Sequence, residues 1–170
     1  MMRGFDDIKE KIVLLTEDIV DFHNELAEKY VVDVAADKNA EADHSVPKIE
    51  SALGSVFADY FGHEPYPTLI EKAAALLYFL AKDHCFHDGN KRVAVHAMET
   101  FLYIHNIILS APDTESVIIK IASSDPVDKD IIIGETVEWL KKWIEEIDDA
   151  DFMIDREGNQ IDIVREPEEE

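Results

Sequence analysis

Helical periodicity dominates the pattern of hydrophobic and polar positions along this chain, and strand-like alternation is scarce. Apolar residues recur at spacings of three and four near the start of the sequence, and they predict a helix over about residues 5–30. This stripe consists of Ile8, Ile12, Leu15, Ile19, Phe22 and Leu26. Residues 35–44 are polar and carry no stripe, so we expect a loop there.

Capping signals predict the next two helices. Ser45 is a good N-cap residue, with a proline in the following turn, and it predicts a second helix that Gly62 ends. Thr68 and Glu71 have the spacing of a capping box and predict a third helix over 69–82. Because residues 69–82 are apolar on nearly all sides, we expect this helix to be central and buried.

Further helices are expected in the second half of the chain, over about 91–105, 114–122 and 127–147. The segment 152–164 alternates around a Gly-containing turn, which indicates a small hairpin. The predicted class is all-α, a compact helical bundle. We expect one domain over 1–147, followed by an acidic, partly disordered appendage over 148–170.

Composition narrows the function classes. The chain has 170 residues and a net charge of −22, so nucleic-acid binding through a basic surface is not expected. No apolar run is long enough to span a bilayer and the start turns acidic, so we expect a cytoplasmic protein without membrane contact. The single cysteine, Cys85, excludes an internal disulfide and a multi-cysteine zinc site.

The stretch 84–92, HCFHDGNKR, concentrates the chemistry of an anion site. A helix is expected to start at about Asn90, and the amides of Gly89, Asn90 and Lys91 would point out of its N-terminus. Gly89 allows the backbone to come close to a ligand. Lys91 and Arg92 add positive charge, so the spacing favours a phosphate ligand.

A base and a metal ligand lie beside this anion site. Asp88 supplies a hard oxygen ligand suited to Mg²⁺. His84, four residues earlier, can accept a proton from an incoming hydroxyl group. These are the groups that phosphoryl or nucleotidyl transfer requires.

The same stretch matches the signature H-x-F-x-D-G-N-K-R of the Fic/Doc family at all seven specified positions. The resemblance extends more loosely over about residues 15–125. Residues 19–23 (IVDFH) resemble the family's early helix, and 49–53 (IESAL) and 72–74 (KAA) resemble segments before the motif.

The resemblance implies a helical enzyme that moves part of ATP or a related nucleotide, with Mg²⁺, to a Ser, Thr or Tyr hydroxyl of a target protein. It implies that His84 is the base and Phe86 the buried anchor of the loop. It further implies that Asp88 binds Mg²⁺ and that Arg92 binds phosphate. The anion nest would be formed by Gly89, Asn90 and Lys91. A flap that aligns the target is expected over 62–67; it includes Gly62, His63, Glu64 and Tyr66, with His63 or Tyr66 over the nucleotide.

Two positions resemble the death-on-curing (Doc) branch of the family, whose members phosphorylate a translation factor. Lys91 stands where the adenylylating branch has Gly, and Val95 stands where that branch has a second Arg. Phosphoryl transfer therefore ranks above the alternative, protein adenylylation. The sequence has no [ST]-x-x-x-E-[GN] inhibitory motif, so we expect an antitoxin to restrain a toxin of this kind.

Two alternatives from other classes stay open. His63, the pair His87 and Asp88, and Asp113 resemble the metal ligands of HD-type phosphohydrolases. A nucleotide-binding module without turnover would keep the same nest.

The remaining reactive side chains are interpreted as structural. We expect Cys85 to be a partly buried loop residue and His87 an exposed one. His96 and His105 are expected at the boundary of their helix. His23 is expected to be a hydrogen-bonded core or rim histidine.

Overall fold

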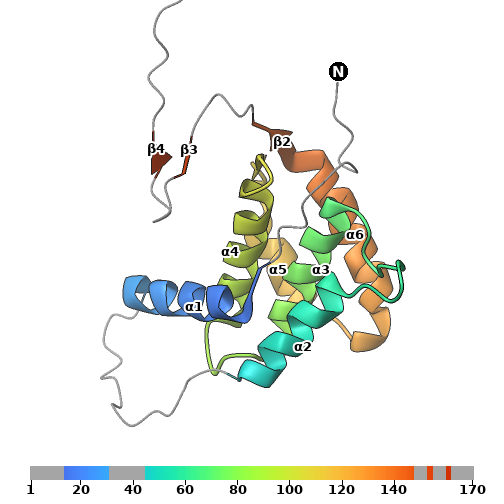
Figure 1. Cartoon of the computed structure of the whole chain (residues 1–170), viewed down its shortest axis with the longest axis horizontal. Coiled ribbons are helices and arrows are strands. Elements are labelled where there is room, and N and C mark those ends of the chain that lie inside the picture. The colour runs from blue at the N-terminus through green and yellow to red at the C-terminus, as the bar shows by residue number, and fades with distance from the viewer. Residues whose placement is uncertain (1–13, 31–44, 148–152, 155–159, 162–170) are drawn as a thin grey trace, which may run out of the picture.

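The computed structural model describes residues 14–30, 45–147, 153–154 and 160–161, and their fold is mostly helical (Figure 1). Its helices are α1 (Thr16–Tyr30), α2 (Val46–Phe57), α3 (Leu69–Lys82), α4 (Asn90–Tyr103), α5 (Thr114–Ser123), the 3₁₀ turn η1 (Pro126–Asp128) and α6 (Lys129–Trp143). Its strands are β1 (Ile107–Leu109), β2 (Ile144–Glu146), β3 (Met153–Ile154) and β4 (Gln160–Ile161). The predicted all-α class is confirmed.

Helix α3 lies at the centre of the bundle and contacts α2, α4, α5 and α6 (Figure 1). Ten of its 14 residues are buried. Ala73, Ala74 and Ala75 are fully buried, and their small side chains let the neighbouring helices approach closely. The prediction of a central, buried helix is confirmed. Helix α1 packs against α4 and α2.

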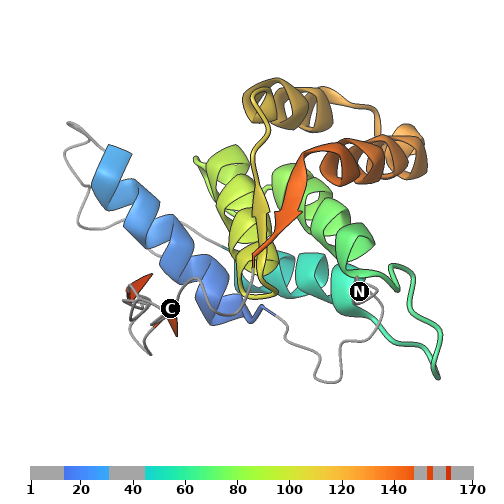
Figure 2. The same cartoon turned by 90° about the horizontal axis from the view of Figure 1, so that it is seen from above.

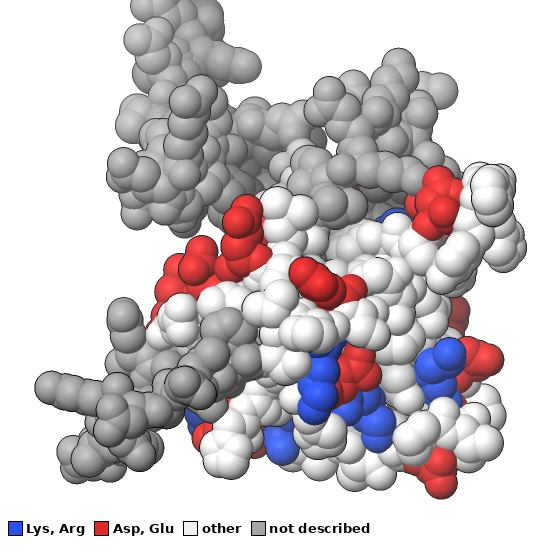
Figure 3. All heavy atoms as spheres, turned by 60° about the horizontal axis from the view of Figure 1, so that its bottom comes forward, with Lys and Arg blue, Asp and Glu red and all other residues white. Residues whose placement is uncertain are grey.

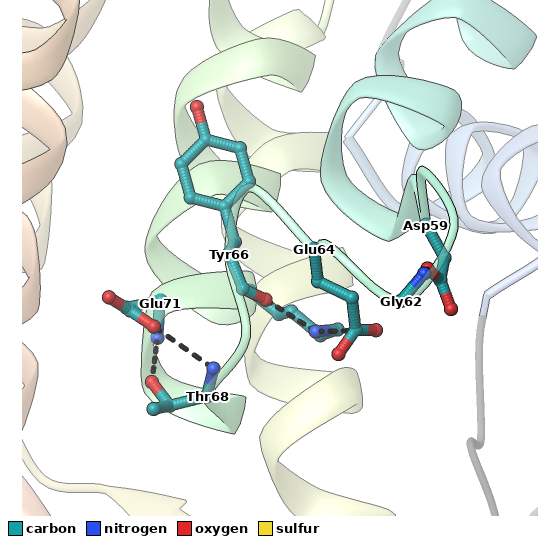
Figure 4. Close-up of polar contacts among 7 residues, drawn as sticks. Asp59, Gly62, Glu64, Tyr66, Thr68 and Glu71 are labelled. Carbon is teal, nitrogen blue, oxygen red and sulfur yellow. Dashed lines mark hydrogen bonds and ion pairs between the residues drawn. The ribbon is translucent and has the colours of Figure 1, made fainter.

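The capping signals start their helices as predicted. Ser45 Oγ accepts a hydrogen bond of 3.4 Å from the amide of Lys48 at the start of α2. Thr68 Oγ1 accepts one of 3.2 Å from the amide of Glu71, and Glu71 Oε2 accepts one of 2.9 Å from the amide of Thr68. Figure 4 shows this reciprocal pair at the start of α3.

The boundaries of α1 and α2 differ from the prediction. Leu15, expected on the buried stripe, precedes α1 and is 51% exposed, while residues 5–13 of that stripe lie outside the described residues. Helix α2 ends at Phe57 rather than at Gly62. Tyr60 and His63 form a bridge around a tight turn, in which Gly62 has a φ of +88° and donates to Asp59 Oδ1 at 2.7 Å.

A small sheet, β1 with β2, was not predicted. The helix expected over 127–147 ends at Trp143, and Ile144–Glu146 pairs antiparallel with Ile107–Leu109 (Figure 2). Ile107 is buried, so this sheet covers one end of the core. Three-residue strands are too short to show alternation, and their pairing joins segments far apart in the sequence.

In the tail, β3 pairs antiparallel with β4, which confirms the predicted hairpin. Its expected turn over 155–159 lies outside the described residues, as does the polar segment 35–44. The division into 1–147 and 148–170 stays a prediction. None of the helices that the structure describes has the length and apolar character to cross a membrane.

Candidate active site

The sequence HCFHDGNKR forms the connection between α3 and α4. Helix α3 ends at Lys82, and Asp83 caps it by donating its amide to the carbonyl of Phe79 at 2.9 Å. Residues 84–89 then form an irregular loop, and α4 begins at Asn90. The predicted base and metal ligand therefore lie in the loop between two helices, and the predicted anion nest lies where the second helix begins.

The side chain of Asn90 holds this loop closed. Its Oδ1 accepts a hydrogen bond of 3.0 Å from the amide of Phe86, and its Nδ2 donates one of 2.9 Å to the carbonyl of Phe86. The Phe86 ring is only 4% exposed. Because both polar groups of the Asn90 side chain are used in the loop, the predicted role of Asn90 in an anion nest falls to its backbone amide.

Gly89 gives the start of α4 an unusual form. It has a φ of +86°, a left-handed conformation that side chains disfavour, and it caps the helix without a side-chain hydrogen bond. Its amide donates to the exposed carboxylate of Asp88 at 2.7 Å. The start of α4 thus lies beside the exposed Asp88 and has no side-chain cap from Gly89, and the N-terminal amides of a helix are groups that bind anions.

Positive charge lies next to this helix start. Lys91 and Arg92 are exposed and line a groove of about 660 Å³ between α1, α4 and α5. The walls of the groove combine apolar side chains such as Leu26 and Ile118 with carboxylates such as Glu25. Its volume lies in the range of small-molecule sites. Figure 3 shows Lys and Arg side chains grouped on part of one face, although acids outnumber bases in the chain.

His84 is exposed and has a φ of +49°, which a residue with a side chain rarely adopts outside strained sites. The start of α2 supports the backbone at His84 and at the residue after it. Lys48 Nζ donates to the carbonyl of His84 at 3.5 Å, and the amide of Ser45 donates to the carbonyl of Cys85 at 2.7 Å. This support holds the imidazole at the surface of the loop.

The groups flanking His84 are shifted toward their neutral forms. Burial raises the pKa of Asp83, and electrostatic interactions with His84 and Lys48 oppose that shift. Burial raises the pKa of the Cys85 thiol to about 11, with a further contribution from Asp83. Cys85 is only 1% exposed, so it is more deeply buried than predicted. A thiol that stays protonated at neutral pH is a poor nucleophile, in agreement with a structural role.

His87 is exposed and His96 is half-buried in α4, as the sequence indicates. His105 is also half-buried, but it lies beyond the end of α4 at Tyr103 rather than on that helix as predicted. His63 belongs to the turn after α2. Among the residues described here, no group of three or more His, Cys, Asp or Glu side chains is arranged to hold a metal ion. Asp113, the remaining residue of the phosphohydrolase set, instead accepts a hydrogen bond from the Trp139 indole at 2.9 Å.

His23 is the residue whose link to the motif the sequence did not reveal. It is half-buried and hydrogen-bonded, as predicted, but its partners are residues of the motif. Its ring stacks on Phe86 with centroids 4.1 Å apart, and its Nε2 lies 3.1 Å from the carbonyl oxygen of Asp88. The available signal was its place in the IVDFH segment that resembles the family's early helix.

The segment predicted as the flap lies along α3 (Figure 4). Lys72 forms an ion pair of 3.4 Å with Glu64 and donates to the carbonyl of Tyr66. The Tyr66 ring packs edge-on against Phe79, with centroids 6.3 Å apart. Burial, and then the negative charge of Asp130 in α6, raise the pKa of Tyr66. These contacts direct Tyr66 toward α3 and α6, and a position of His63 or Tyr66 over a nucleotide stays a prediction.

Comparisons with known proteins agree with the motif. The family model described as Fic/DOC family matches residues 13–102. The chain is also similar to the protein named Toxin Doc of Mycolicibacterium smegmatis, with 44% identity over 63 residues. That alignment covers 37% of this chain and 48% of the relative, so the chain spans about half the length of the curated protein it matches. The family model matches more than half of the residues of this chain, so the chain belongs to the Fic/DOC family.

Proposed function

We propose that this chain is a Doc-like transferase that moves the terminal phosphoryl group of ATP, or of another nucleotide, to a Ser, Thr or Tyr hydroxyl of a protein target. One observation carries the proposal. A single loop brings together the exposed imidazole of His84, the exposed carboxylate of Asp88 and the open start of α4 at Gly89.

The residues present fit a nucleotide phosphate and Mg²⁺. Gly89 places no side chain over the first amides of α4, and Lys91 and Arg92 add positive charge beside them. Asp88 has the hard oxygen ligand that Mg²⁺ prefers, and the ion commonly takes its other ligands from phosphates and water. A bound Mg²⁺ supplies charge neutralisation on the phosphates, and Asp88 would hold it.

The chain's own residues then account for transfer. The His84 imidazole accepts the proton of the target hydroxyl as its oxygen bonds to phosphorus. The bond between that phosphorus and the bridging oxygen breaks, and the nucleoside diphosphate leaves. The amides at the start of α4 and the Arg92 guanidinium bind the phosphate charge during the reaction. Asn90 and Phe86 fix the loop that carries these groups.

The choice of phosphoryl over adenylyl transfer rests on two positions. Lys91 fills the nest position at which the adenylylating branch has Gly, and Val95 replaces that branch's second Arg. A lysine in the nest favours a nucleotide bound with its terminal phosphate toward the target. Adenylylation is the second candidate, because the same base and nest serve either product.

The printed name of the relative, Toxin Doc, supports a further part of the proposal. We infer that the chain acts as a toxin and that an antitoxin restrains it. This inference agrees with the lack of an inhibitory [ST]-x-x-x-E-[GN] motif in the sequence.

The decisive experiment is intact-mass spectrometry of host-lysate proteins incubated with the full chain, ATP and Mg²⁺. We expect a phosphate-sized adduct on a target, lost with His84→Ala. His87→Ala is the matched control, since His87 is an exposed histidine of the same loop, and it should keep the adduct. An AMP-sized adduct would select adenylylation. An adduct of either size that persists in His84→Ala would refute the assigned base.

A further inference from the structure

We propose that His23 is a positioning residue of the active site, because it fixes the peptide unit between Asp88 and Gly89. The expected effect on nucleotide binding rests on the proposed function. The positioning itself is argued from the geometry around His23. Three features of the motif meet at this one side chain of α1: the Phe86 ring, the Asp88 carbonyl and the space beside Gly89.

The hydrogen bond to Asp88 fixes the tautomer of His23. Its Nε2 lies 3.1 Å from the Asp88 carbonyl oxygen. A carbonyl oxygen only accepts hydrogen bonds, so the His23 ring carries a proton on Nε2 and donates it. The near-parallel stack on Phe86, with 6° between the two ring planes, sets the direction of this donor.

The Asp88 carbonyl and the Gly89 amide belong to the same planar peptide, in which they point in opposite directions. His23 holds the carbonyl on the α1 side. The Gly89 N–H must then face the opposite side, where it meets the carboxylate of Asp88 at 2.7 Å. That N–H is the first donor of the proposed anion nest, so His23 determines its direction.

Gly89 limits how else this peptide can be held. A Cβ atom built on Gly89 would lie 3.6 Å from Cδ2 of His23, so the ring packs directly against the glycine. Gly89 has a left-handed φ, and because glycine has no side chain it can adopt other φ values as well. Without an outside contact, the peptide between Asp88 and Gly89 is therefore free to rotate. His23 supplies that contact from another helix.

The test uses three variants of the full chain. His23→Phe keeps an aromatic ring for the stack but removes the donor. His23→Gln places an amide nitrogen the same number of bonds from Cα as Nε2, and so restores the donor without the ring. His105→Phe is the matched control: His105 also contacts a phenylalanine ring, that of Phe101 at 4.9 Å, but beyond the other end of α4.

Two readouts separate positioning from stability. The first is the ATP dissociation constant in Mg²⁺, compared with the ATP KM of transfer. We expect His23→Phe to weaken both about fivefold to tenfold, the effect of one lost hydrogen bond, with His23→Gln within about twofold of the wild type. Partial unfolding would instead lower the number of active molecules and leave KM unchanged.

The second readout needs neither activity nor nucleotide. The chain has six glycines, so ¹⁵N-glycine labelling gives at most six amide resonances, and Gly89→Ala identifies the one from Gly89. This resonance should move in His23→Phe, return toward its original position in His23→Gln, and stay in place in His105→Phe. An unmoved Gly89 resonance and an unchanged ATP affinity in His23→Phe would overturn the inference. If the Gly89 resonance responds to the His23 variants but the chain transfers no group, the proposed transferase activity would be overturned. The positioning role of His23 would still stand.

Discussion

The N-termini of α3 and α4 are satisfied in different ways. At α3, the Thr68 hydroxyl accepts the amide of Glu71 and the Glu71 carboxylate accepts the amide of Thr68 (Figure 4). At α4, the cap residue is Gly89, which has no side chain to offer, and its amide donates to the exposed carboxylate of Asp88.

This difference separates a helix start that is closed by its own side chains from the one at which we propose an anion site. At the start of α3, the amides of Thr68 and Glu71 are bound by side chains of the same turn, so they contribute to folding. At the start of α4, the Gly89 amide has a partner, the Asp88 carboxylate, that is itself suited to bind a metal. A glycine cap gives up only a few tenths of a kcal/mol relative to the preferred cap residues. A small loss of stability therefore leaves the backbone open to an anion.

The largest expected effect is on ATP affinity, and it comes from placing a capping side chain at the uncapped start of α4. Gly89→Asp puts a capping carboxylate where phosphate would bind and adds a negative charge, so ATP affinity in Mg²⁺ should fall about 100-fold, or about 2.7 kcal/mol. Isothermal titration calorimetry measures this loss. Gly89→Ala controls for the left-handed φ, which costs a side chain about 1–2 kcal/mol of stability. Equal losses of affinity in the two variants would show that strain, and not occupation of the nest, is responsible.

A smaller effect is expected from releasing the motif loop. Asn90→Ala removes both hydrogen bonds to the backbone of Phe86, a buried residue, so the free energy of unfolding should fall by about 2 kcal/mol. Urea denaturation measures this change. Asn90→Asp keeps the acceptor for the Phe86 amide but loses the donor to the Phe86 carbonyl. Its free energy of unfolding should therefore lie between those of the wild type and Asn90→Ala. An Asn90→Ala variant as stable as the wild type would mean that the loop is held by His23 and the start of α2 alone.

Features set by neighbouring residues could be predicted from the sequence. Thr68 with Glu71, and Ser45 with its following proline, mark helix starts because cap and acceptor lie within one turn. The all-round apolar pattern of 69–82 marks a buried helix for the same reason. The motif over 84–92 lies between two helical patterns, so the sequence alone predicts the turn between α3 and α4.

Features set by distant residues could not be predicted. The pairing of Ile107 with Glu146 depends on α4 and α6 both packing against α3, and no local pattern in the sequence records it. The contact of His23 with the motif joins residues 65 positions apart, so in the sequence His23 looks like any rim histidine of an amphipathic helix. Tyr66 is a third case, because its contact with Phe79 depends on how the chain folds back along α3.

The smallest effect should be on stability, and it should come from removing the capping side chain at the start of α3. Thr68→Ala removes the hydroxyl that accepts the Glu71 amide and so breaks the capping box, which should lower the free energy of unfolding by about 1 kcal/mol in urea denaturation. Thr68→Ser keeps the hydroxyl and should restore most of that stability. Neither variant should change ATP affinity in the folded chain, because these amides belong to the fold. A Thr68→Ala variant whose ATP affinity falls while Thr68→Ser is normal would contradict the separation, since it would make the start of α3 part of the nucleotide site as well.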